Sequence, residues 1–377
     1  MKNPDFIPLA KPDLSGNEEK YVVDAIRSSW ISSIGDYVKR FEQEFAQICG
    51  TRTAIGVCNG TVALHLALMA LDVRPGDEVL VPSLTYIATA NAVRYVGAEP
   101  VFVDVDPDTW CIDPLKLESA ITPRSRGIIP VHLYGHPADM DVINHIAGVH
   151  GLWVLEDAAE AHLAKYKGRH AGSLAHIAAF SFYGNKIFTS GEGGAITLDD
   201  PHMELRTRTL RGQGMDPQRR YYFPVTGYNF RLTNVACAIL CAQIERHAAI
   251  VSRRKQIFTD YKNLLDGVAG IGFQPCASWA EPAGWLFCIT VDKKSYGRSR
   301  DELMALLSEK GIETRPFFLS LHKLPPFREE SRKRGEQLPV TDRLSETGMN
   351  LPTFNDLESR DIERIAAVIR NGCKTRR

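Results

Sequence analysis

The sequence contains no apolar run long enough to cross a membrane. Nowhere do about 18 or more apolar residues follow one another, as a membrane-spanning helix requires. The opening residues Met1-Lys2-Asn3-Pro4-Asp5 also lack the apolar stretch of a signal peptide. We therefore expect a cytoplasmic protein without a membrane partner.

An excess of charge of either sign is also absent, because 45 Lys and Arg residues balance 45 Asp and Glu residues. A nucleic-acid-binding protein usually carries a basic excess or a basic stripe. The local cluster Arg219-Arg220 is short, and such clusters are usually solvated surface. We predict no nucleic-acid partner.

Cysteine is sparse, with eight residues scattered over 377 positions and mostly in apolar surroundings. This distribution is typical of small core residues in a reducing compartment. Cys237 and Cys241 would share one face of a helix, but no second Cys or His pair stands at ligand spacing. We predict no metal site.

The first half of the chain alternates short apolar segments with helical ones. The strand-like segments are 78–81, 100–104, 127–131 and 152–155, and residues 88–95 between two of them are helical in pattern. Near-continuous apolar strands separated by helices predict a mostly parallel sheet covered on both faces. Such α/β sheets bind ligands beyond the carboxyl ends of their strands.

The second half has a different pattern. Apolar residues at three- and four-residue spacing predict one long helix over residues 235–267, followed by a strand over 285–291 and helices near 300–310 and 361–370. We predict a large α/β domain over residues 1–250 and a smaller C-terminal α+β domain over residues 251–377.

Two segments contain candidate binding residues that would lie at the ends of strands. Asn59-Gly60-Thr61 opens a helical run, and with Thr61 as cap its free amides would attract a phosphate, although most such segments are only caps. Asp157 ends the apolar segment Val154-Leu155-Glu156, where a buried carboxylate needs a partner. A protonated pyridine nitrogen would serve, as would an N-cap or an ordinary ion pair.

A lysine supplies the third element. Lys186 follows the apolar segment that contains Ser181 and precedes the glycine-rich turn Gly191-Glu192-Gly193-Gly194. Burial or neighbouring cations lower the pKa of a lysine and make it a nucleophile. A phosphate cradle, a strand-end aspartate and a lysine in this order are what a pyridoxal 5'-phosphate (PLP) enzyme requires.

Seven motifs extend this pattern over residues 8 to 355, and with them the chain closely resembles the DegT family of sugar aminotransferases. They are Asn59-Gly60-Thr61, Pro82-Ser83-Leu84-Thr85-Tyr86, Glu156-Asp157-Ala158-Ala159-Glu160-Ala161, Ser181-Phe182-Tyr183-Gly184-Asn185-Lys186, Gly191-Glu192-Gly193-Gly194, Gly227-Tyr228-Asn229-Phe230-Arg231, and Arg315-Pro316-Phe317 through His322. The resemblance implies the fold-type-I architecture of aspartate aminotransferase: a large, mostly parallel sheet domain and a smaller α+β domain.

The resemblance also implies roles for single residues. In these roles Lys186 bonds to PLP and moves protons, Asp157 pairs with the pyridine nitrogen, and Glu160 lies near the ring hydroxyl. The remaining cofactor contacts and weaker substrate contacts follow: Tyr86 stacks on the ring; Gly60, Thr61 and Ser181 hold the phosphate; Asn229 reaches the phosphate in a second subunit of a homodimer; Arg231, Arg315 and His322 contact substrate, or equally are ion pairs or core groups.

Several segments resemble the perosamine branch of that family, which transfers an amino group from L-glutamate to GDP-4-keto-6-deoxymannose. They are Trp30–Ser33, His132–Pro137, Gly184–Lys186 and Arg211–Gly214, whereas His162 differs from that branch. A dTDP- or UDP-linked keto sugar, aminated at C3 or C4, is the nearest alternative. A PLP-dependent sugar dehydratase is disfavoured because it has His at the position of Lys186, and a non-catalytic PLP-binding regulator would carry a further DNA-binding domain.

Overall fold

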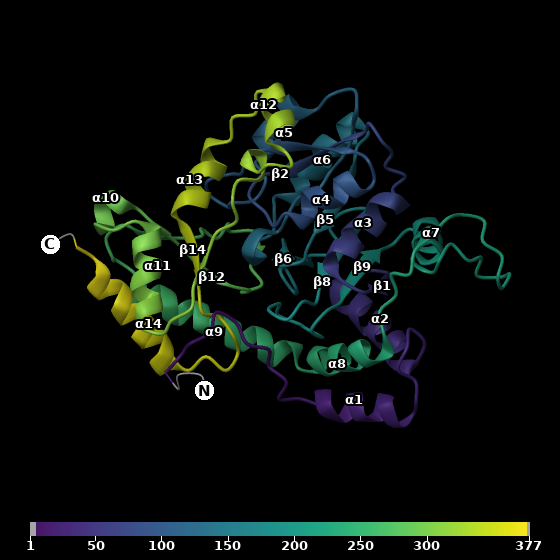
Figure 1. Cartoon of the computed structure of the whole chain (residues 1–377), viewed down its shortest axis with the longest axis horizontal. Helices are drawn as coiled ribbons and strands as arrows, with labels where there is room; N and C mark the ends of the chain where they lie inside the picture. The colour runs from purple at the N-terminus through teal and green to yellow at the C-terminus, as the bar shows by residue number, and fades with distance from the viewer. Residues whose placement is uncertain (1–4, 375–377) are drawn as a thin grey trace.

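The computed structural model describes residues 5–374, and a seven-stranded sheet forms its centre. The strands stand in the order β1-β9-β8-β5-β4-β2-β3 (Figure 1). Their bounds are Thr53–Val57 (β1), Glu78–Pro82 (β2), Glu99–Val103 (β3), Ser125–Ile128 (β4), Trp153–Asp157 (β5), Ile177–Ser181 (β8) and Gly194–Leu198 (β9). The predicted strands of the first half all lie here.

Only β9 runs against the other strands of this sheet. The pairs β2–β3, β2–β4, β4–β5 and β5–β8 are parallel, whereas β9 pairs antiparallel with both β8 and β1. β1 therefore points the same way as β8 and β5, so their carboxyl ends meet at one edge. The prediction of an α/β fold with a mostly parallel sheet is confirmed.

Helices cover both faces of the sheet because alternate strand residues face opposite ways. On one face Leu80, Ile128 and Val154 pack with side chains of α2 (Asp36–Cys49), α6 (Met140–His150) and α8 (Asn234–Glu245). On the other, Val79 and Leu155 pack with α3 (Gly60–Ala70) and α4 (Ala88–Tyr95). α5 (Pro114–Ala120), α7 (Pro201–Arg211) and α1 (Glu18–Arg27) complete the helices before α8.

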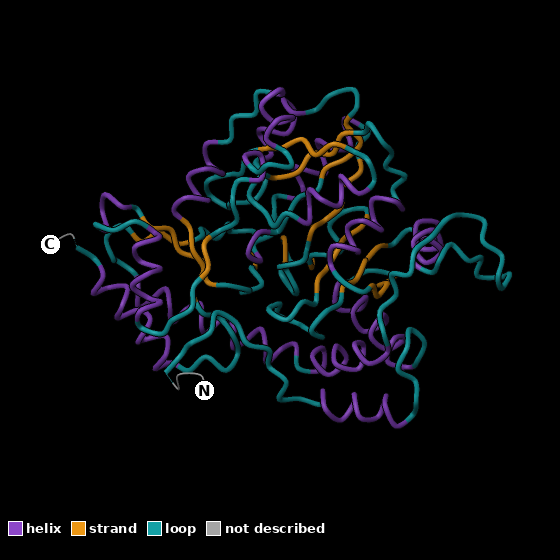
Figure 2. Tube along the Cα trace, in the orientation of Figure 1, coloured by secondary structure: helices purple, strands orange, loops and turns teal. Residues whose placement is uncertain are grey.

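A second, antiparallel sheet of order β10-β12-β14-β13 lies beside the first (Figure 2). Its strands are Ile271–Phe273, Phe287–Val291, Gly348–Leu351 and Arg315–Pro316 for β10, β12, β14 and β13. It packs with α9 (His247–Leu265), α11 (Arg300–Glu309) and α14 (Ser359–Gly372) around one apolar cluster. Residue 250 falls within the first turn of α9, so a domain boundary there stays a prediction.

The remaining elements are short. They are β6 (Lys165–Tyr166), β7 (Arg169–His170) and β11 (Ala280–Glu281), which form a three-stranded sheet, and α10 (Lys293–Tyr296), α12 (Arg328–Arg334), α13 (Pro339–Thr347) and the 3-10 turns η1 (Leu133–Gly135) and η2 (Leu321–Lys323).

The prediction of one long helix over 235–267 is wrong, because the chain bends by 65° between α8 and α9. Arg246 stands at the break with φ −103° and ψ 8°. Its guanidinium binds both carboxylate oxygens of Asp13, at 3.2 and 3.0 Å. Within the described part of the chain no single helix meets the length and hydropathy expected of a membrane span; α8 and α9 do so only when the bent pair is taken together.

The segment between α7 and α8 extends away from the rest of the molecule (Figures 1 and 2). At its base the backbone N–H of Gln213 donates to the carbonyl of Tyr228 at 2.8 Å. Between these ends the rings of Tyr221 and Phe223 are exposed, 71 % and 51 % accessible, next to the exposed Arg219 and Arg220. We call residues 213–228 the arm.

Candidate active site

The strand-end residues named from the sequence lie along one edge of the large sheet. β1 leads directly into α3, β5 ends at Asp157, and β8 ends at Ser181. These three strands point the same way, and β9 begins at the same edge with Gly194 paired to Ser181 and Val57. The topology therefore brings the start of α3 and both strand ends together.

The start of α3 is capped by Asn59 and not, as predicted, by Thr61, because the helix begins at Gly60, two residues earlier than a Thr61 cap implies. The Asn59 Oδ1 accepts from the Val62 amide at 2.9 Å. Gly60 lies directly against Ser181, and a Cβ added to Gly60 would stand 2.6 Å from the Ser181 Cβ. The first amides of the helix and the Ser181 hydroxyl therefore lie next to each other, as an anion-binding cradle needs.

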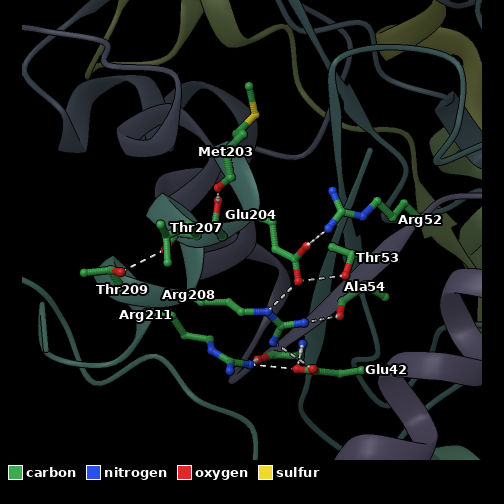
Figure 3. Close-up of polar contacts among 12 residues, drawn as sticks. Glu42, Arg52, Thr53, Ala54, Met203, Glu204, Thr207, Arg208, Thr209 and Arg211 are labelled. Carbon is green, nitrogen blue, oxygen red and sulfur yellow. Dashed lines mark hydrogen bonds and ion pairs between the residues drawn. The ribbon is translucent and has the colours of Figure 1, made fainter. Parts of the chain in front are cut away.

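β1 carries this helix start, and within residues 5–374 no strand lies along its outer edge, where charged side chains bind instead (Figure 3). Glu42 of α2 accepts from the Gly56 amide at 2.9 Å, and Arg211 of α7 donates to the Gly56 carbonyl at 2.8 Å. Arg211 and Arg208 also bind the two oxygens of Glu42, at 2.8 and 2.9 Å. This network satisfies the strand edge and fixes the position of β1 under the α3 terminus.

Asp157 is buried and accepts two hydrogen bonds. Its Oδ2 accepts from the Thr89 hydroxyl at 2.7 Å, and its Oδ1 accepts from the Ala159 amide at 3.2 Å. Burial raises the pKa of Asp157, which the two hydrogen bonds and the charge of Lys186 lower in part. Among the described residues no Lys, Arg or His side chain forms an ion pair with it, and it accepts only these two hydrogen bonds, so part of its acceptor capacity is unused.

Glu160 follows Asp157 by three residues and is also buried. Its Oε2 accepts from the backbone N–H of Tyr134 at 2.7 Å, and its Oε1 lies 3.9 Å from the Lys186 Nζ. Burial raises the pKa of Glu160 to about 7, although Lys186, the Tyr134 amide and Arg315 each lower it. Near neutral pH this carboxyl is therefore only partly ionised.

Lys186 lies in the turn between β8 and β9, and its side chain is nearly enclosed. Burial lowers the pKa of Lys186, whereas the charges of Glu160 and Asp157 raise it. The Nζ stands 3.9 Å from the ring centroid of Trp285, over its face. A buried amine with a lowered pKa beside two carboxylates can act as a nucleophile and as a proton carrier.

The other predicted contacts divide into two groups. Tyr86 is exposed near Phe318, with ring centroids 5.9 Å apart. Arg315 is close enough for its charge to lower the pKa of Lys186. Asn229 and Arg231 bind each other instead, with Arg231 Nε and an Nη donating to the Asn229 Oδ1 at 3.2 and 3.0 Å.

His322 lies in η2, buried beside Ser83, the residue that follows β2. Its Nδ1 lies 2.9 Å from the Ser83 hydroxyl, and its Nε2 lies 3.6 Å from an oxygen of Asp342. Burial lowers the pKa of His322, while Asp342 raises it. Among the described residues only Nδ1 is hydrogen bonded, since 3.6 Å is too long for a bond between Nε2 and Asp342; contact of this ring with a substrate stays a prediction.

Three residues at the site were not identified from the sequence: Thr89, Tyr134 and Trp285. Thr89 lies in the first turn of α4, and only its position four residues after Thr85 of a quoted motif hints at its role. Tyr134 has the left-handed φ of 54°, which no residue pattern indicates. Trp285 comes from a segment 100 residues away from the turn that it contacts.

His162, which differs from the perosamine branch, lies in an aromatic pocket. Its ring is 5.7, 5.3 and 5.5 Å from those of Phe180, Phe182 and Phe188. Burial lowers its pKa to about 3, and neither ring nitrogen makes a hydrogen bond among the described residues. The histidine is therefore a neutral core side chain.

Comparison with known proteins agrees with this geometry. Residues 12–370 match the model of the DegT/DnrJ/EryC1/StrS aminotransferase family. The chain is 45 % identical to GDP-perosamine synthase of Caulobacter vibrioides, over 96 % of this chain and 97 % of that one. It is 40 % identical to GDP-perosamine synthase of Escherichia coli O157:H7, over 95 % and 96 % of the two chains.

Solved structures agree as well. S. venezuelae DesV in complex with a ketimine intermediate superposes with a TM-score of 0.91 at 36 % identity, covering 99 % of this chain and 100 % of DesV. DesI, solved in the presence of its TDP-sugar product, gives 0.90 at 30 % identity, covering 99 % and 94 %. The predicted fold-type-I architecture is confirmed. The chain belongs to the DegT/DnrJ/EryC1/StrS aminotransferase family.

Proposed function

We propose that this aminotransferase binds PLP and transfers an amino group from L-glutamate to a GDP-linked 4-keto-6-deoxy sugar. The observation that carries the proposal is the buried Lys186 amine, 3.9 Å from Glu160, at the sheet edge where Asp157 ends β5. The runner-up substrate is a dTDP- or UDP-linked keto sugar.

The described residues fit PLP at three points. The amides of Gly60 and Thr61 and the Ser181 hydroxyl would hold the phosphate, since Gly60 leaves no space for a Cβ beside Ser181. Asp157, whose pKa burial raises, would gain a cationic partner in the pyridine nitrogen. Tyr86, exposed near Phe318, would stack on the ring.

The chemistry divides between cofactor and chain. When bound, PLP supplies an electron sink for the carbon from which a proton is lost. Asp157 holds a proton at the ring nitrogen, and Lys186 takes and returns protons through its Nζ. Because burial lowers the pKa of Lys186, its neutral form is available as a base. Glu160, bonded to the Tyr134 amide, lies beside that Nζ and balances its charge.

Sequence similarity supports the choice of GDP sugar. Three relatives named GDP-perosamine synthase are 36–45 % identical to this chain, whereas DesI, solved with a TDP-sugar product, is 30 % identical. The branch motifs Trp30–Ser33, His132–Pro137 and Gly184–Lys186 come from separate parts of the chain. Their agreement supports GDP-4-keto-6-deoxymannose as the acceptor and GDP-perosamine as the product.

The site would be completed by a second copy of the chain in a homodimer. The arm exposes Tyr221 and Phe223, and apolar surface of this kind usually meets a partner. Asn229 follows the arm directly and would reach the phosphate of the neighbouring subunit. Mixing inactive Lys186→Ala and Asn229→Ala protomers should then restore activity in the mixed dimer, whereas full activity in a monomer would contradict the proposal.

Borohydride reduction tests the cofactor and its lysine together. After reconstitution with PLP, reduction should leave a phosphopyridoxyl group on the peptide that contains Lys186. The matched control is Lys167→Ala, because Lys167 is an exposed lysine paired with Asp141. In this variant the peptide that contains Lys186 should be labelled as in the wild type. A label on another lysine, or none at all, would overturn the assignment.

The acceptor is tested by direct comparison of nucleotide sugars. With glutamate as donor, kcat/KM for GDP-4-keto-6-deoxymannose should exceed the values for dTDP- and UDP-4-keto-6-deoxyglucose by about a hundredfold or more, the scale on which unpaired buried polar groups discriminate. Equal rates, or preference for the dTDP sugar, would replace the substrate and leave the aminotransferase activity in place.

A further inference from the structure

Trp285 joins the second sheet to the turn that carries Lys186. Its indole Nε1 donates to the backbone carbonyl of Asn185 at 2.7 Å, directly before the lysine in the chain. Its own carbonyl accepts from the guanidinium of Arg254 in α9 at 2.7 Å. Two residues earlier, the Ala283 amide donates to the Gly135 carbonyl at 2.9 Å. The tryptophan is therefore fixed on both sides.

The ring face of this tryptophan meets the lysine amine. Lys186 Nζ lies 3.9 Å from the ring centroid, and both side chains are withdrawn from solvent. Tyr134 stacks against the same indole, with centroids 6.2 Å apart and planes at 21°. An ammonium over an indole face is stabilised by the ring quadrupole, more strongly where water is excluded.

We propose that Trp285 is a positioning residue that holds the Lys186 ammonium over its indole face whenever the lysine is not bonded to the cofactor. The inference rests on the proposed function, because it takes Lys186 as the cofactor lysine. In a transamination this lysine is released in every turnover, takes up a proton as a base, and must keep its place and that proton until it returns the proton. The indole face supplies the place, and its N–H bond to Asn185 fixes the turn.

Several charges face the same amine. Glu160 and Asp157 favour its protonated form, while burial and Arg315 of β13 disfavour it. Because burial lowers the pKa of His162 to about 3, its ring is neutral near pH 7 and adds no charge. Trp285 therefore acts in the same direction as the carboxylates, and removing its ring should make Lys186 lose its proton at lower pH.

The test measures the proton state of Lys186 in the loaded enzyme. The holoenzyme is treated with L-glutamate, which frees the lysine, and the glutamate is removed. Acetylation of Lys186 by acetic anhydride is then followed against pH by peptide mass spectrometry. Trp285→Leu should lower the pH midpoint by about one unit, a tenfold change in the protonation equilibrium. Trp285→Phe, which keeps a ring, should shift it less.

Trp279→Leu is the matched control. Trp279 packs on the rings of His136 and Tyr166, at 5.5 and 4.9 Å, so its loss removes an indole without a contact to Lys186. The midpoint should then stay at the wild-type value. A role limited to packing would change the extent of acetylation but not its midpoint.

A second measurement keeps the shape of the side chain. Tryptophans with one, two and four ring fluorines, incorporated at position 285, weaken the negative face but retain the N–H donor. The midpoint should fall stepwise with fluorine number, and an unchanged midpoint in this series would overturn the inference. A different failure is visible before glutamate is added: if Lys186 is then already as reactive as afterwards, the cofactor lysine is wrongly assigned.

Discussion

Thr89→Val tests whether Asp157 must remain ionised for catalysis. The Thr89 hydroxyl donates the shorter of the two hydrogen bonds that Asp157 accepts, at 2.7 Å, and valine has almost the same shape without the donor. A hydrogen bond to a charged group contributes about 1.5–3 kcal/mol. Since about 1.4 kcal/mol corresponds to one pKa unit, the pKa of Asp157 should rise by about one to two units beyond the increase that burial already causes.

The sign of the effect on activity follows from the ionised form. A carboxyl with a higher pKa is ionised only at higher pH, so the acid limb of the rate profile should move upward by about one unit or more. The rate at high pH should change little, because the carboxylate is ionised there in both proteins. The half-reaction with L-glutamate, followed by the absorbance of the cofactor at each pH, measures this limb without the keto sugar.

Thr85→Val is the control for this experiment. The Thr85 Oγ1 lies 3.2 Å from the Thr89 Oγ1, and Thr89 uses its own proton toward Asp157, so Thr85 is the donor between the two hydroxyls. Its effect reaches the carboxylate only through Thr89 and should be the smaller of the two. If wild type and both variants share one acid limb, the ionised state of Asp157 does not limit the reaction.

Three further predictions follow from the site. Burial raises the pKa of Glu160 from 4.5 to about 7, so between these pH values the folded protein holds more protons than the unfolded chain. The stability of the fold should therefore decrease as pH rises through this range, and Glu160→Gln should flatten that decrease in a series of Tm values measured against pH. Gly194→Ala places a Cβ 2.5 Å from the Asn59 carbonyl and should weaken PLP binding about tenfold or more in a fluorescence titration, unlike Gly148→Ala, whose Cβ meets nothing within 4 Å. Glu156→Gln should cost about 3 kcal/mol of unfolding free energy in a urea titration, whereas Asp157→Asn should cost less than about 1 kcal/mol and abolish turnover.

The strands of the large sheet were predictable because each is a short apolar run between helical segments. A strand that is buried on both faces is apolar along its whole length, so its local composition is enough to identify it. The same logic located Asp157, since parallel strands place their carboxyl ends at one edge. The roles assigned to the site residues came from family resemblance and stay predictions, among them Asn229 at a neighbouring subunit.

Contacts between distant parts of the chain could not be predicted. The bend at Arg246 depends on Asp13, 233 residues away, and no Gly or Pro marks it, so the apolar spacing continues through the break. The Trp285 bond to Asn185 spans 100 residues. The shift of the helix cap from Thr61 to Asn59 is a smaller error, since both residue types accept from helix amides and only the geometry decides between them.

Two neighbouring, equally buried carboxylates on β5 differ in how fully the fold satisfies them with hydrogen bonds. Glu156 accepts from the amides of Gly172, Leu174 and Ala175 at 2.8, 2.7 and 3.0 Å, and its Oε2 lies 3.0 Å from the His132 ring. Its acceptor capacity is used, so it joins segments of the fold and has none to offer a ligand. Asp157, equally buried, accepts only two hydrogen bonds and has a raised pKa. A buried charge left with unused acceptors costs stability, and a cationic ligand that satisfies them recovers that stability on binding. If Asp157 pairs with a protonated ring as proposed, the stability lost at this carboxylate would be the source of its affinity for the ring.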